Sequence, residues 1–408
     1  MRRPSPRMEG VDVQLVSKRR LPDGSAWLNQ YRVCEKLAST ELSSVFRVEE
    51  TNPSSGAVTS FCCKRYRKIL LLRRREYRPG PTGMGFMTKL EDVKEEARIL
   101  ALLDHPRCLK LKEILDSNPD SADGKVYFIT SFMQGGALMV LKNIRDDDLE
   151  RSCLSESDVS AALPAEATED VVREKFVPQL EAIRTFTEAQ AKCFIRDAAE
   201  GLAYLHEDLG VCHRDLKVDN LLLGADGRVC LGDFGSAEKM SANGKVRHTK
   251  GTYMFMAPEC LRPIEESKPY EGHDGRAADT WALGICAYVM IFGTVPFGAN
   301  SIESLFEAIG EGIVRIPENP PISPELRDFF RRVLHPEWQD RISVRQILEE
   351  YGRQPIVGLC LNCAGPSLGS VSEYHFTVIK LFLPPVSHKA SQCSDCGALL
   401  ELRRTTPG

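Results

Sequence analysis

Residues 213–220 read HRDLKVDN, so that an aspartate, a lysine and an asparagine fall within six consecutive positions. The triplet DFG follows at residues 233–235, and the triplet APE stands at residues 257–259. One such triplet alone is weak evidence, but three motifs in this order rarely arise by chance. We therefore interpret the flanking sequence relative to these three motifs.

The sequence before the motifs has the pattern of strands. β-Branched and aromatic residues alternate from Tyr31 onward and are interrupted by turn residues at 52–56, as in antiparallel strands. Residues 91–103 have the apolar spacing of an amphipathic helix, and residues 126–132 read as a further strand. Residues 64–78, with eight basic side chains, are expected to form a loop. This part of the chain therefore predicts a β-rich unit with one helix.

The sequence from residue 187 onward has mainly the pattern of helices. Thr187 and Gln190 have the spacing of a capping box, and apolar residues then recur every three or four positions until Gly210. Further helical patterns occupy residues 277–292, 302–309, 324–334 and 343–351. The chain therefore predicts an α+β protein with a small β-rich lobe before a larger helical lobe.

The composition excludes several protein classes. The chain has 408 residues, 42% apolar and 27% charged, which excludes collagen-like and wholly disordered chains. The 53 Lys and Arg residues against 57 Asp and Glu give a net charge of −4, which argues against a nucleic-acid binder. We expect no signal peptide and no membrane span, because no apolar run reaches about 18 residues. With 14 cysteines interpreted as reduced thiols, we expect a cytoplasmic enzyme.

The three motifs resemble those of the eukaryotic protein kinases. The resemblance covers about residues 29–351 and implies the two-lobed kinase fold, with one regulatory helix in a β-rich N-lobe and a larger helical C-lobe. The boundaries that we expect are a flexible N-terminal arm at 1–28, the N-lobe and hinge at 29–133, the C-lobe at 134–351 with an acidic insert at 142–186, and a C-terminal tail at 352–408. The insert holds 11 acidic and 6 basic residues, as a surface segment would.

Within the kinases, the sequence resembles the calcium/calmodulin-dependent protein kinase kinases. The residues that carry this likeness are LNQY at 28–31, an Arg/Pro/Gly-rich insert at 73–85, LDHP at 103–106 and FMAPE at 255–259. The likeness implies transfer of the γ-phosphoryl group of ATP to serine or threonine hydroxyls of proteins, other protein kinases among them. It also raises calmodulin as a partner.

The kinase resemblance implies a role for each polar residue of the motifs. Asp215 is the expected catalytic base, which accepts the proton of the substrate hydroxyl, and Lys217 reaches the γ-phosphate. Asn220 and Asp233 supply oxygen ligands of the kind that Mg²⁺ prefers. ATP and Mg²⁺ are therefore the implied cofactors.

A lysine that would hold the α- and β-phosphates is found from its context. Lys64 follows three apolar residues, 61–63, at the end of a predicted buried strand, where a plain surface lysine is not expected. Its partner in the resemblance is Glu96 on the following helix, with the adjacent Glu95 as a competitor. Glu96 and Leu100 are four residues apart and share one helix face, which favours Glu96.

The other nucleotide contacts follow from the register with the motifs. Thr130 is the expected gatekeeper at the end of the last N-lobe strand, and Ser131 and Met133 would offer backbone groups to adenine. The residues expected around the adenine ring and under the phosphates are Leu37, Ala38, Ser43, Val45, Cys62 and Leu222. The apolar ones also suit a plain lobe core, and only their register favours the nucleotide site.

The phosphate-covering loop departs from the kinase pattern. Residues 37–45 read LASTELSSV, with Ala38, Thr40 and Ser43 at the three positions where kinases carry glycine. Glycine allows open φ values and close approach to phosphates, whereas a β-branched threonine is stiff. Glu41 adds a negative charge. We therefore expect weaker nucleotide binding, and a pseudokinase scaffold with little or no transfer is the alternative function.

The segment between the DFG and APE triplets carries two threonines of interest. Thr252 resembles the threonine that contacts the catalytic aspartate in serine/threonine kinases, which favours serine and threonine substrates. Thr249 is a candidate phosphorylation site whose phosphate could pair with Arg214. Arg341 is expected to pair with Glu259 in a structural role.

The tail after residue 351 leaves three interpretations open. It contains two C-x-x-C pairs, whose cysteines are Cys360, Cys363, Cys393 and Cys396. Such pairs indicate a zinc ribbon, although the 29 residues between them are a long spacing. A calmodulin-binding segment is the second interpretation, but the apolar stretch 376–383 is less basic and shorter than a typical target helix. A disordered or packed tail is the third.

Overall fold

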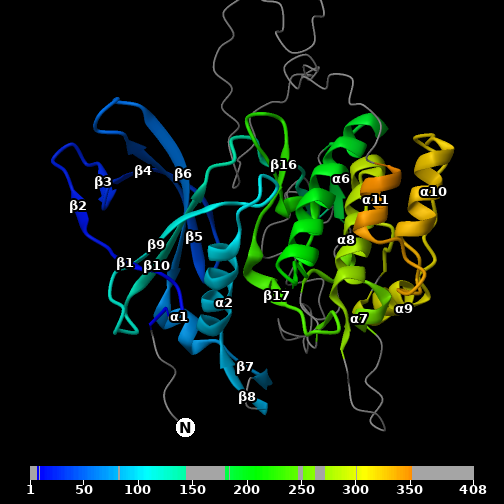
Figure 1. The fold of residues 1–408 in the computed structure, drawn as a ribbon, viewed down its shortest axis with the longest axis horizontal. Helices are drawn as coiled ribbons and strands as arrows, with labels where there is room; N and C mark the ends of the chain where they lie inside the picture. The colour runs from blue at the N-terminus through cyan, green and yellow to red at the C-terminus, as the bar shows by residue number, and fades with distance from the viewer. Residues whose placement is uncertain are drawn as a thin grey trace, which may run out of the picture.

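The computed structural model describes residues 7–8, 10–80, 83–143, 180–182, 184–246, 251–261, 272–299 and 301–351 of the chain. These residues form two lobes, a β-sheet lobe and a lobe of packed helices, which lie beside each other in Figure 1. Helix α2 (Lys89–Leu102) lies on the side of the sheet lobe that faces the helical lobe. The α+β, two-lobed arrangement expected from the sequence is confirmed.

The first lobe is built on an eight-stranded sheet with the strand order β1-β9-β10-β6-β5-β4-β3-β2. Its strands are β1 (Gln14–Leu15), β2 (Lys18–Arg20), β3 (Ala26–Leu28), β4 (Tyr31–Ser39), β5 (Ser43–Thr51), β6 (Val58–Arg67), β9 (Leu111–Asp116) and β10 (Lys125–Ser131). Neighbours pair antiparallel except β1 and β9, which are parallel.

The register of strand β6 places the predicted nucleotide-binding residues on one face of the sheet. Cys62 pairs with Thr130 and Lys64 with Phe128 of β10, while Val45 of β5 pairs with Lys64. Because residues two apart on a strand point to the same face, these side chains share the face on which Lys64 reaches α2. The sheet therefore gathers them toward the helical lobe.

The N-terminal arm contains strands, so the prediction of a flexible segment is wrong for residues 14–28. Strand β1 extends one edge of the sheet, and strands β2 and β3 extend the other. Leu28, 8% exposed, packs with Tyr31, Cys63 and Leu115 on the outer face of the sheet. The arm is ordered because this apolar face needs a cover, a requirement that the arm's own composition does not reveal.

The basic segment 64–78 is also structured, in contrast to the predicted loop. Strand β6 continues into it, helix α1 (Lys68–Arg73) follows, and the hairpin of β7 (Arg75–Gly80) and β8 (Gly83–Thr88) leads to α2. The many basic residues suggested an exposed loop, but Lys68 is fully buried and lies 2.5 Å from the buried Asp116. Leu71, 1% exposed, anchors α1 in the core.

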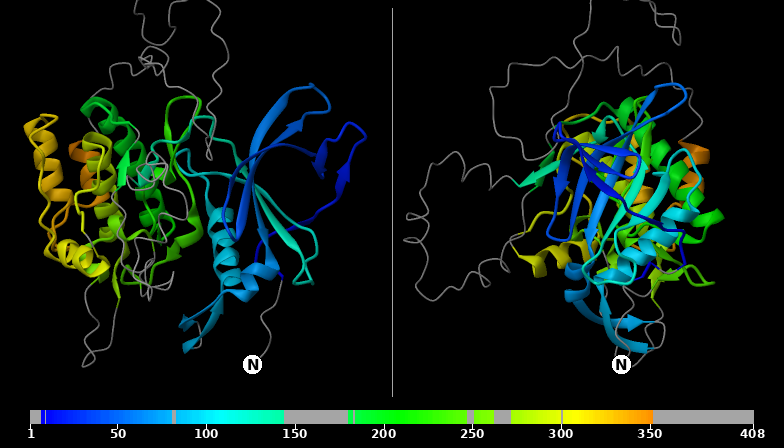
Figure 2. Two further views of the ribbon diagram at one scale, coloured as in Figure 1. Left: turned by 180° about the vertical axis from the view of Figure 1, so that it is seen from behind. Right: turned by 90° about the vertical axis from the view of Figure 1, so that its left-hand side faces the viewer.

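The second lobe packs its helices around α8 (Gly275–Phe292), most of whose side chains are buried. The other helices are α6 (Glu188–Ala203), followed by the π-helical turn η1 (Tyr204–Asp208), α7 (Pro258–Leu261), α9 (Ile302–Glu311), α10 (Pro324–Val333) and α11 (Val344–Glu350). Helix α6 begins at the capping box of Thr187 and Gln190 that the sequence predicts. Figure 2 shows these helices gathered on the side away from the sheet.

Short strands and single turns hold the motif segments between the lobes. The strands are β11 (Gly136–Ala137), β15 (Leu221–Leu223) and β16 (Val229–Leu231) in one sheet, and the pairs β12 (Leu141–Asn143) with β13 (Leu180–Ala182), β14 (Val211–Cys212) with β17 (Glu238–Lys239), and β18 (Lys245–Val246) with β19 (His273–Asp274). The 3-10 turns are η2 (Val218–Asn220), η3 (Phe234–Ser236) and η4 (Tyr253–Phe255). The HRDLKVDN and DFG segments both lie in this layer.

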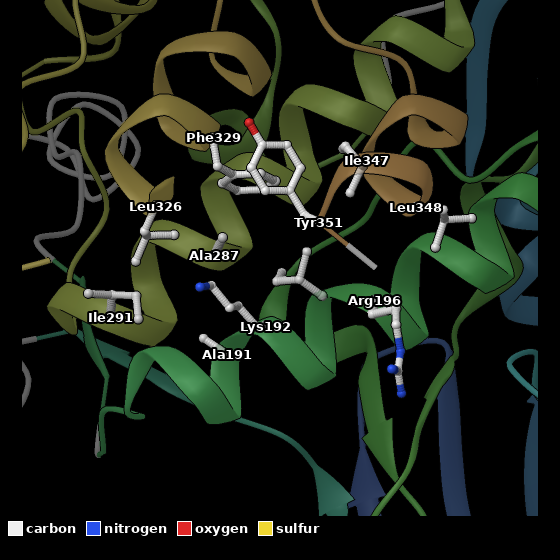
Figure 3. Close-up of a pocket in the computed structure, with 11 residues that line it drawn as sticks. Ala191, Lys192, Arg196, Ala287, Ile291, Leu326, Phe329, Ile347, Leu348 and Tyr351 are labelled. Carbon is white, nitrogen blue, oxygen red and sulfur yellow. The ribbon is translucent and has the colours of Figure 1, made fainter. Parts of the chain in front are cut away.

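A narrow apolar cavity lies among helices α6, α8, α10 and α11 (Figure 3). The small side chains of Ala191 and Ala287 line it, as do the rings of Phe329 and Tyr351. Those two rings meet edge to face, with centroids 5.3 Å apart. The cavity is lined by helix residues and contains none of the motif residues. Within the described ranges, none of the helices is both long and apolar enough to cross a bilayer.

Candidate active site

The HRDLKVDN loop is fixed to helix α8 by one buried carboxylate, that of Asp279. Its Oδ2 accepts the backbone N–H of His213 at 2.7 Å and lies 2.8 Å from Nε2 of His206, while its Oδ1 accepts the backbone N–H of Arg214 at 2.8 Å. Burial opposes ionisation, but hydrogen bonds from His206 and the Arg214 backbone lower the pKa of Asp279. The loop is therefore tied to the most buried helix of the lobe.

The predicted catalytic residues Asp215, Lys217 and Asn220 lie together with Thr252. Oδ1 of Asp215 accepts the hydroxyl of Thr252 at 2.9 Å and its backbone N–H at 3.0 Å. Nζ of Lys217 donates to Oγ1 of Thr252 at 3.1 Å and lies 3.3 Å from Oδ2 of Asp215. Nδ2 of Asn220 donates to the backbone carbonyl of Asp215 at 2.7 Å, which leaves the amide oxygen for a cation.

The glycine before Thr252 is required by this arrangement. Gly251 has a φ of +112°, and a Cβ on it would lie 2.4 Å from the carbonyl oxygen of Arg214. A side chain here would force the segment away from the loop that carries Asp215. The contact between Thr252 and Asp215 therefore depends on Gly251.

Lys64 connects the sheet lobe to the DFG triplet. Its Nζ lies 2.9 Å from Oε1 of Glu96 and 2.9 Å from Oδ1 of Asp233. Burial alone would lower the pKa of Lys64, but Glu96, Tyr66 and Asp233 raise it well above its ordinary value. The Lys64 charge in turn lowers the pKa of Asp233 to about 2. Asp233 is therefore an anion at neutral pH, as a Mg²⁺ ligand must be.

The choice between Glu96 and Glu95 is resolved by the faces of helix α2. Glu96 is 4% exposed and contacts Lys64, whereas Glu95 turns outward and pairs with Arg98 at 2.8 Å. The shared face of Glu96 and Leu100 was the sequence signal for this difference, and Leu100 is 3% exposed.

The DFG triplet directs its aspartate toward β6 and its phenylalanine into the core. Phe234 is 1% exposed, and its ring centroid lies 5.2 Å from that of His213. Nε2 of His213 lies 2.9 Å from the carbonyl oxygen of Gly232. Asp233 has a left-handed φ of +53°, which turns the chain between these two orientations. Leu100 is buried in the same apolar cluster as Phe234.

The predicted adenine site lies where the two lobes are joined. Thr130 is 5% exposed and pairs with Cys62 across the sheet. The backbone N–H of Ser131 donates to the Lys110 carbonyl at 2.9 Å, so this donor is already used. The Met133 carbonyl accepts the N–H of Gly136 at 3.0 Å, so this carbonyl too is already bonded within the chain. The half-buried residues Leu37, Val45, Cys62 and Leu222 are the apolar candidates nearby.

The phosphate-covering loop has a regular shape of its own. Ala38 still pairs with Val45, and the turn that follows is closed by Thr40 and Ser43, whose hydroxyl oxygens lie 2.9 Å apart. The Ser43 N–H donates to Oγ1 of Thr40 at 3.0 Å. Among the described non-glycine residues, positive φ occurs at positions outside this loop. The strain expected where glycine is missing is therefore not found, because hydroxyl bonds build the turn instead.

Two arginines of the helical lobe hold buried or partly buried carboxylates. Arg341 and Glu259 form the predicted pair, with Nη1–Oε1 at 2.6 Å and Nη2–Oε2 at 2.9 Å. Arg214, with a side chain 4% exposed, pairs with Glu238 of β17. The sequence suggested a phosphate on Thr249 as the partner of Arg214, and the structure places a carboxylate beside it. Thr249 itself lies outside the described residues, as do Cys360, Cys363, Cys393 and Cys396.

Tyr66 and Glu238 contact site residues but were not predicted from the sequence. Tyr66 stands two residues after Lys64, and its hydroxyl donates to Oε2 of Glu96 at 2.7 Å. The period of two in a strand places it on the Lys64 face, which was the available signal. Glu238 lies three residues after the DFG triplet, and only its pairing with β14 beside Arg214 reveals its contact.

The residues present fit a nucleotide with its metal. The Asp233 side chain is 49% exposed and ionised. The Asn220 side chain uses its amide nitrogen to bond Asp215, so its amide oxygen could bind a cation. Both are hard oxygen ligands of the kind that Mg²⁺ takes together with phosphate oxygens. Lys64 would hold the α- and β-phosphates. Lys217 lies beside Asp215, where it would contact the γ-phosphate. Bound Mg–ATP would supply the phosphoryl group.

Comparisons with known proteins agree with this geometry. A sequence model described as the protein kinase domain matches residues 166–351. The chain is 28% identical over 328 residues to the serine/threonine-protein kinase GRIK1 of Arabidopsis thaliana, covering 80% of this chain and 67% of that protein. It is 29% identical over 346 residues to a calcium/calmodulin-dependent protein kinase kinase of Caenorhabditis elegans, covering 82% and 54%. These matches support a eukaryotic serine/threonine protein kinase.

The match to the protein kinase domain model covers only one of the two lobes. The matched range, 166–351, covers the helical lobe and leaves out the sheet lobe, where the phosphate loop departs from the family pattern. The structure nevertheless gives that lobe the kinase arrangement of sheet and α2. A further relative, the serine/threonine-protein kinase ssp1 of Schizosaccharomyces pombe, is 28% identical over 286 residues, 68% of this chain and 37% of that protein. The chain thus spans between about one third and two thirds of the length of these three relatives.

Proposed function

We propose that this kinase is catalytically active and transfers the γ-phosphoryl group of ATP to serine or threonine hydroxyls of proteins. The observation that carries the proposal is that one ammonium group, that of Lys64, contacts both Glu96 and Asp233 at 2.9 Å. Phosphoryl transfer in kinases needs the lysine–glutamate pair and the metal-binding aspartate in place together. The contact of Thr252 with Asp215 supports an aliphatic hydroxyl as the acceptor.

We further propose that its substrates include the activation segments of other protein kinases. The support is the sequence likeness at residues 28–31, 73–85, 103–106 and 255–259, together with the kinase-kinase name of the Caenorhabditis relative. Residues 75–80 and 83–88 of the insert region form a hairpin next to α2, beside the segment that carries Thr252. This position suits a contact with a protein substrate rather than with nucleotide.

The proposal is tested with radiolabelled ATP and a panel of activation-segment peptides that carry serine, threonine or tyrosine as the acceptor. Transfer to serine and threonine peptides, lost in Asp215→Asn, is the expected result. If wild-type protein binds Mg–ATP but labels no peptide and no intact kinase, the pseudokinase scaffold replaces the proposal. Transfer that persists in Asp215→Asn would point to a contaminating kinase.

Zinc and calmodulin stay predictions for the tail, since residues 352–408 lie outside the described part of the chain. If the four tail cysteines bind zinc, reduced protein should contain about one metal per chain, and Cys393→Ser should release it. A calmodulin contact should make calcium-dependent capture by immobilised calmodulin depend on the tail. Protein without metal, or without capture, removes the respective prediction.

A further inference from the structure

The carboxylate of Glu96 is buried and has a separate donor for each oxygen. The side chain is 4% exposed, Oε1 accepts Nζ of Lys64 at 2.9 Å, and Oε2 accepts the hydroxyl of Tyr66 at 2.7 Å. A buried charge is stable only where its hydrogen-bonding capacity is met. The position of Glu96, and with it that of α2, therefore depends on two residues of β6.

The ring of Tyr66 is held firmly enough to act as an anchor. The residue is 5% exposed, and its ring meets that of Phe128 edge to face, with centroids 5.5 Å apart at 69°. Nζ of Lys64 lies 5.3 Å from the Tyr66 ring centroid. Because Tyr66 and Lys64 are two residues apart on β6, they share a face and reach the same carboxylate. Burial raises the pKa of the Tyr66 hydroxyl well above its ordinary value, so it stays a donor.

We propose that Tyr66 is a positioning residue that holds Glu96, and hence helix α2, in the arrangement in which Lys64 can engage phosphates. The proposal rests on the kinase function proposed above. Without the hydroxyl, one oxygen of a buried carboxylate would lack a donor, and α2 would gain by turning Glu96 toward water. Such a displacement would separate Glu96 from Lys64. The chain thus carries an internal hydrogen bond that biases its regulatory helix toward the competent position.

The first test is Tyr66→Phe, which keeps the ring packing and removes the hydroxyl. The loss of a hydrogen bond to a buried charged group should lower kcat about 5- to 30-fold. The dissociation constant for Mg–ADP should rise by less than kcat falls, because the contact of Lys64 with the α- and β-phosphates is weakened while the adenine contacts are untouched. Tyr31→Phe is the matched control, because the buried Tyr31 donates to Glu113 in the same sheet but away from the nucleotide face. A kcat within twofold of wild type at a temperature where both proteins are folded overturns the proposal.

A double-mutant cycle separates positioning from a general structural role. If Tyr66 acts through Glu96, then Tyr66→Phe should change kcat/KM for ATP less than twofold in a Glu96→Ala background. A purely structural effect would be additive and of the same size in both backgrounds, which would overturn the proposal.

A readout without catalysis distinguishes failure of this proposal from failure of the kinase function. When Glu96 loosens, Lys64 loses a stabilising anion, so its amine should become more reactive. Trace acetylation followed by mass spectrometry should therefore show Lys64 labelled several-fold faster in Tyr66→Phe and unchanged in Tyr31→Phe. This result is expected even if wild-type protein transfers no phosphate. Unchanged labelling of Lys64 in Tyr66→Phe overturns the proposal.

Discussion

Thr252 donates both its hydroxyl and its backbone N–H to the same oxygen of Asp215, at 2.9 and 3.0 Å. The two residues come from different segments, the HRDLKVDN loop and the activation segment, which is the stretch between the DFG and APE triplets. Oδ2 of Asp215 faces the other two polar residues of the loop, since it accepts Nδ2 of Asn220 at 3.4 Å and lies 3.3 Å from Nζ of Lys217. The orientation of the proposed base therefore depends on whether the activation segment occupies this position.

This relationship predicts the effect of changing Thr252. Thr252→Val keeps the shape but removes the hydroxyl, and should lower kcat about 10-fold or more, since a bond to a charged group is lost. Thr252→Ser restores the hydroxyl and should recover most of the rate. Steady-state peptide kinetics decide the matter. Equal turnover of wild type and Thr252→Val would show that Thr252 does not orient Asp215.

Asp215→Asn should abolish transfer and leave nucleotide binding intact. The substitution removes a general base, whose contribution is typically about 10²- to 10⁴-fold, and touches no predicted phosphate contact. Mg–ADP affinity measured by calorimetry should stay within about threefold of wild type. A variant that retains more than about a tenth of the wild-type rate contradicts the assignment of Asp215 as the base.

The motif residues could be predicted because their chemistry requires fixed residue types at fixed spacing. Asp215, Asn220 and Asp233 fall within one site because each motif sits at a turn between short strands, with β14 paired to β17 and β15 paired to β16. The Lys64–Glu96 pair was predictable from strand and helix periodicity. Such inferences need only local sequence and the knowledge of which segments meet.

Contacts between residues without a motif could not be predicted in the same way. The Glu238–Arg214 pair depends on β17 lying beside β14, which the sequence does not specify. The strands in residues 14–28 form because the outer face of the sheet has to be covered, and this is a property of the assembled lobe. The period of two along the strand places Tyr66 on the same face as Lys64, but its contact with Glu96 is evident only from the orientation of α2.

The low pKa of Asp233 predicts nucleotide binding that does not change with pH near neutrality. A carboxyl whose folded pKa is lowered to about 2 contributes stability at pH values above its ordinary pKa, and loses it as the pH falls through 2. Between pH 5 and pH 8, titration of Asp233 should therefore not alter Mg–ADP affinity. In Lys64→Met, the main cause of the low pKa is gone, so the pKa of Asp233 should rise and Mg–ADP affinity should begin to fall at a higher pH than in wild type. A wild-type decline with a midpoint between pH 5 and pH 7 contradicts this account.

The Arg214–Glu238 pair predicts activity without phosphorylation of the activation segment. Arg214 is buried and already has an anionic partner, so a phosphate on Thr249 is not needed to neutralise it. Phosphatase treatment, checked by mass spectrometry, should change kcat less than about threefold, whereas Glu238→Gln should lower it about 10-fold. Glu350→Gln, which breaks the more exposed pair with Arg332, is the control. Loss of activity on phosphatase treatment would show that a phosphate is required.

Restoring glycine to the phosphate-covering loop should not improve the enzyme. Ala38, Thr40 and Ser43 stand at negative φ, and the Thr40 and Ser43 hydroxyls close the turn at 2.9 Å, so glycine would relieve no strain. It would remove these bonds and add chain entropy, at about 0.5 to 1 kcal/mol for each position. The triple variant Ala38→Gly/Thr40→Gly/Ser43→Gly should therefore show a KM for ATP about two- to tenfold higher than wild type, and a lower Tm. Glu41→Gln, which weakens the contact of the loop tip with Arg74 and leaves the hydroxyls in place, separates loss of charge from loss of the turn. A lower KM in the glycine variant would mean that the side chains obstruct the phosphates, and that the hydroxyl turn is not the working form of the loop.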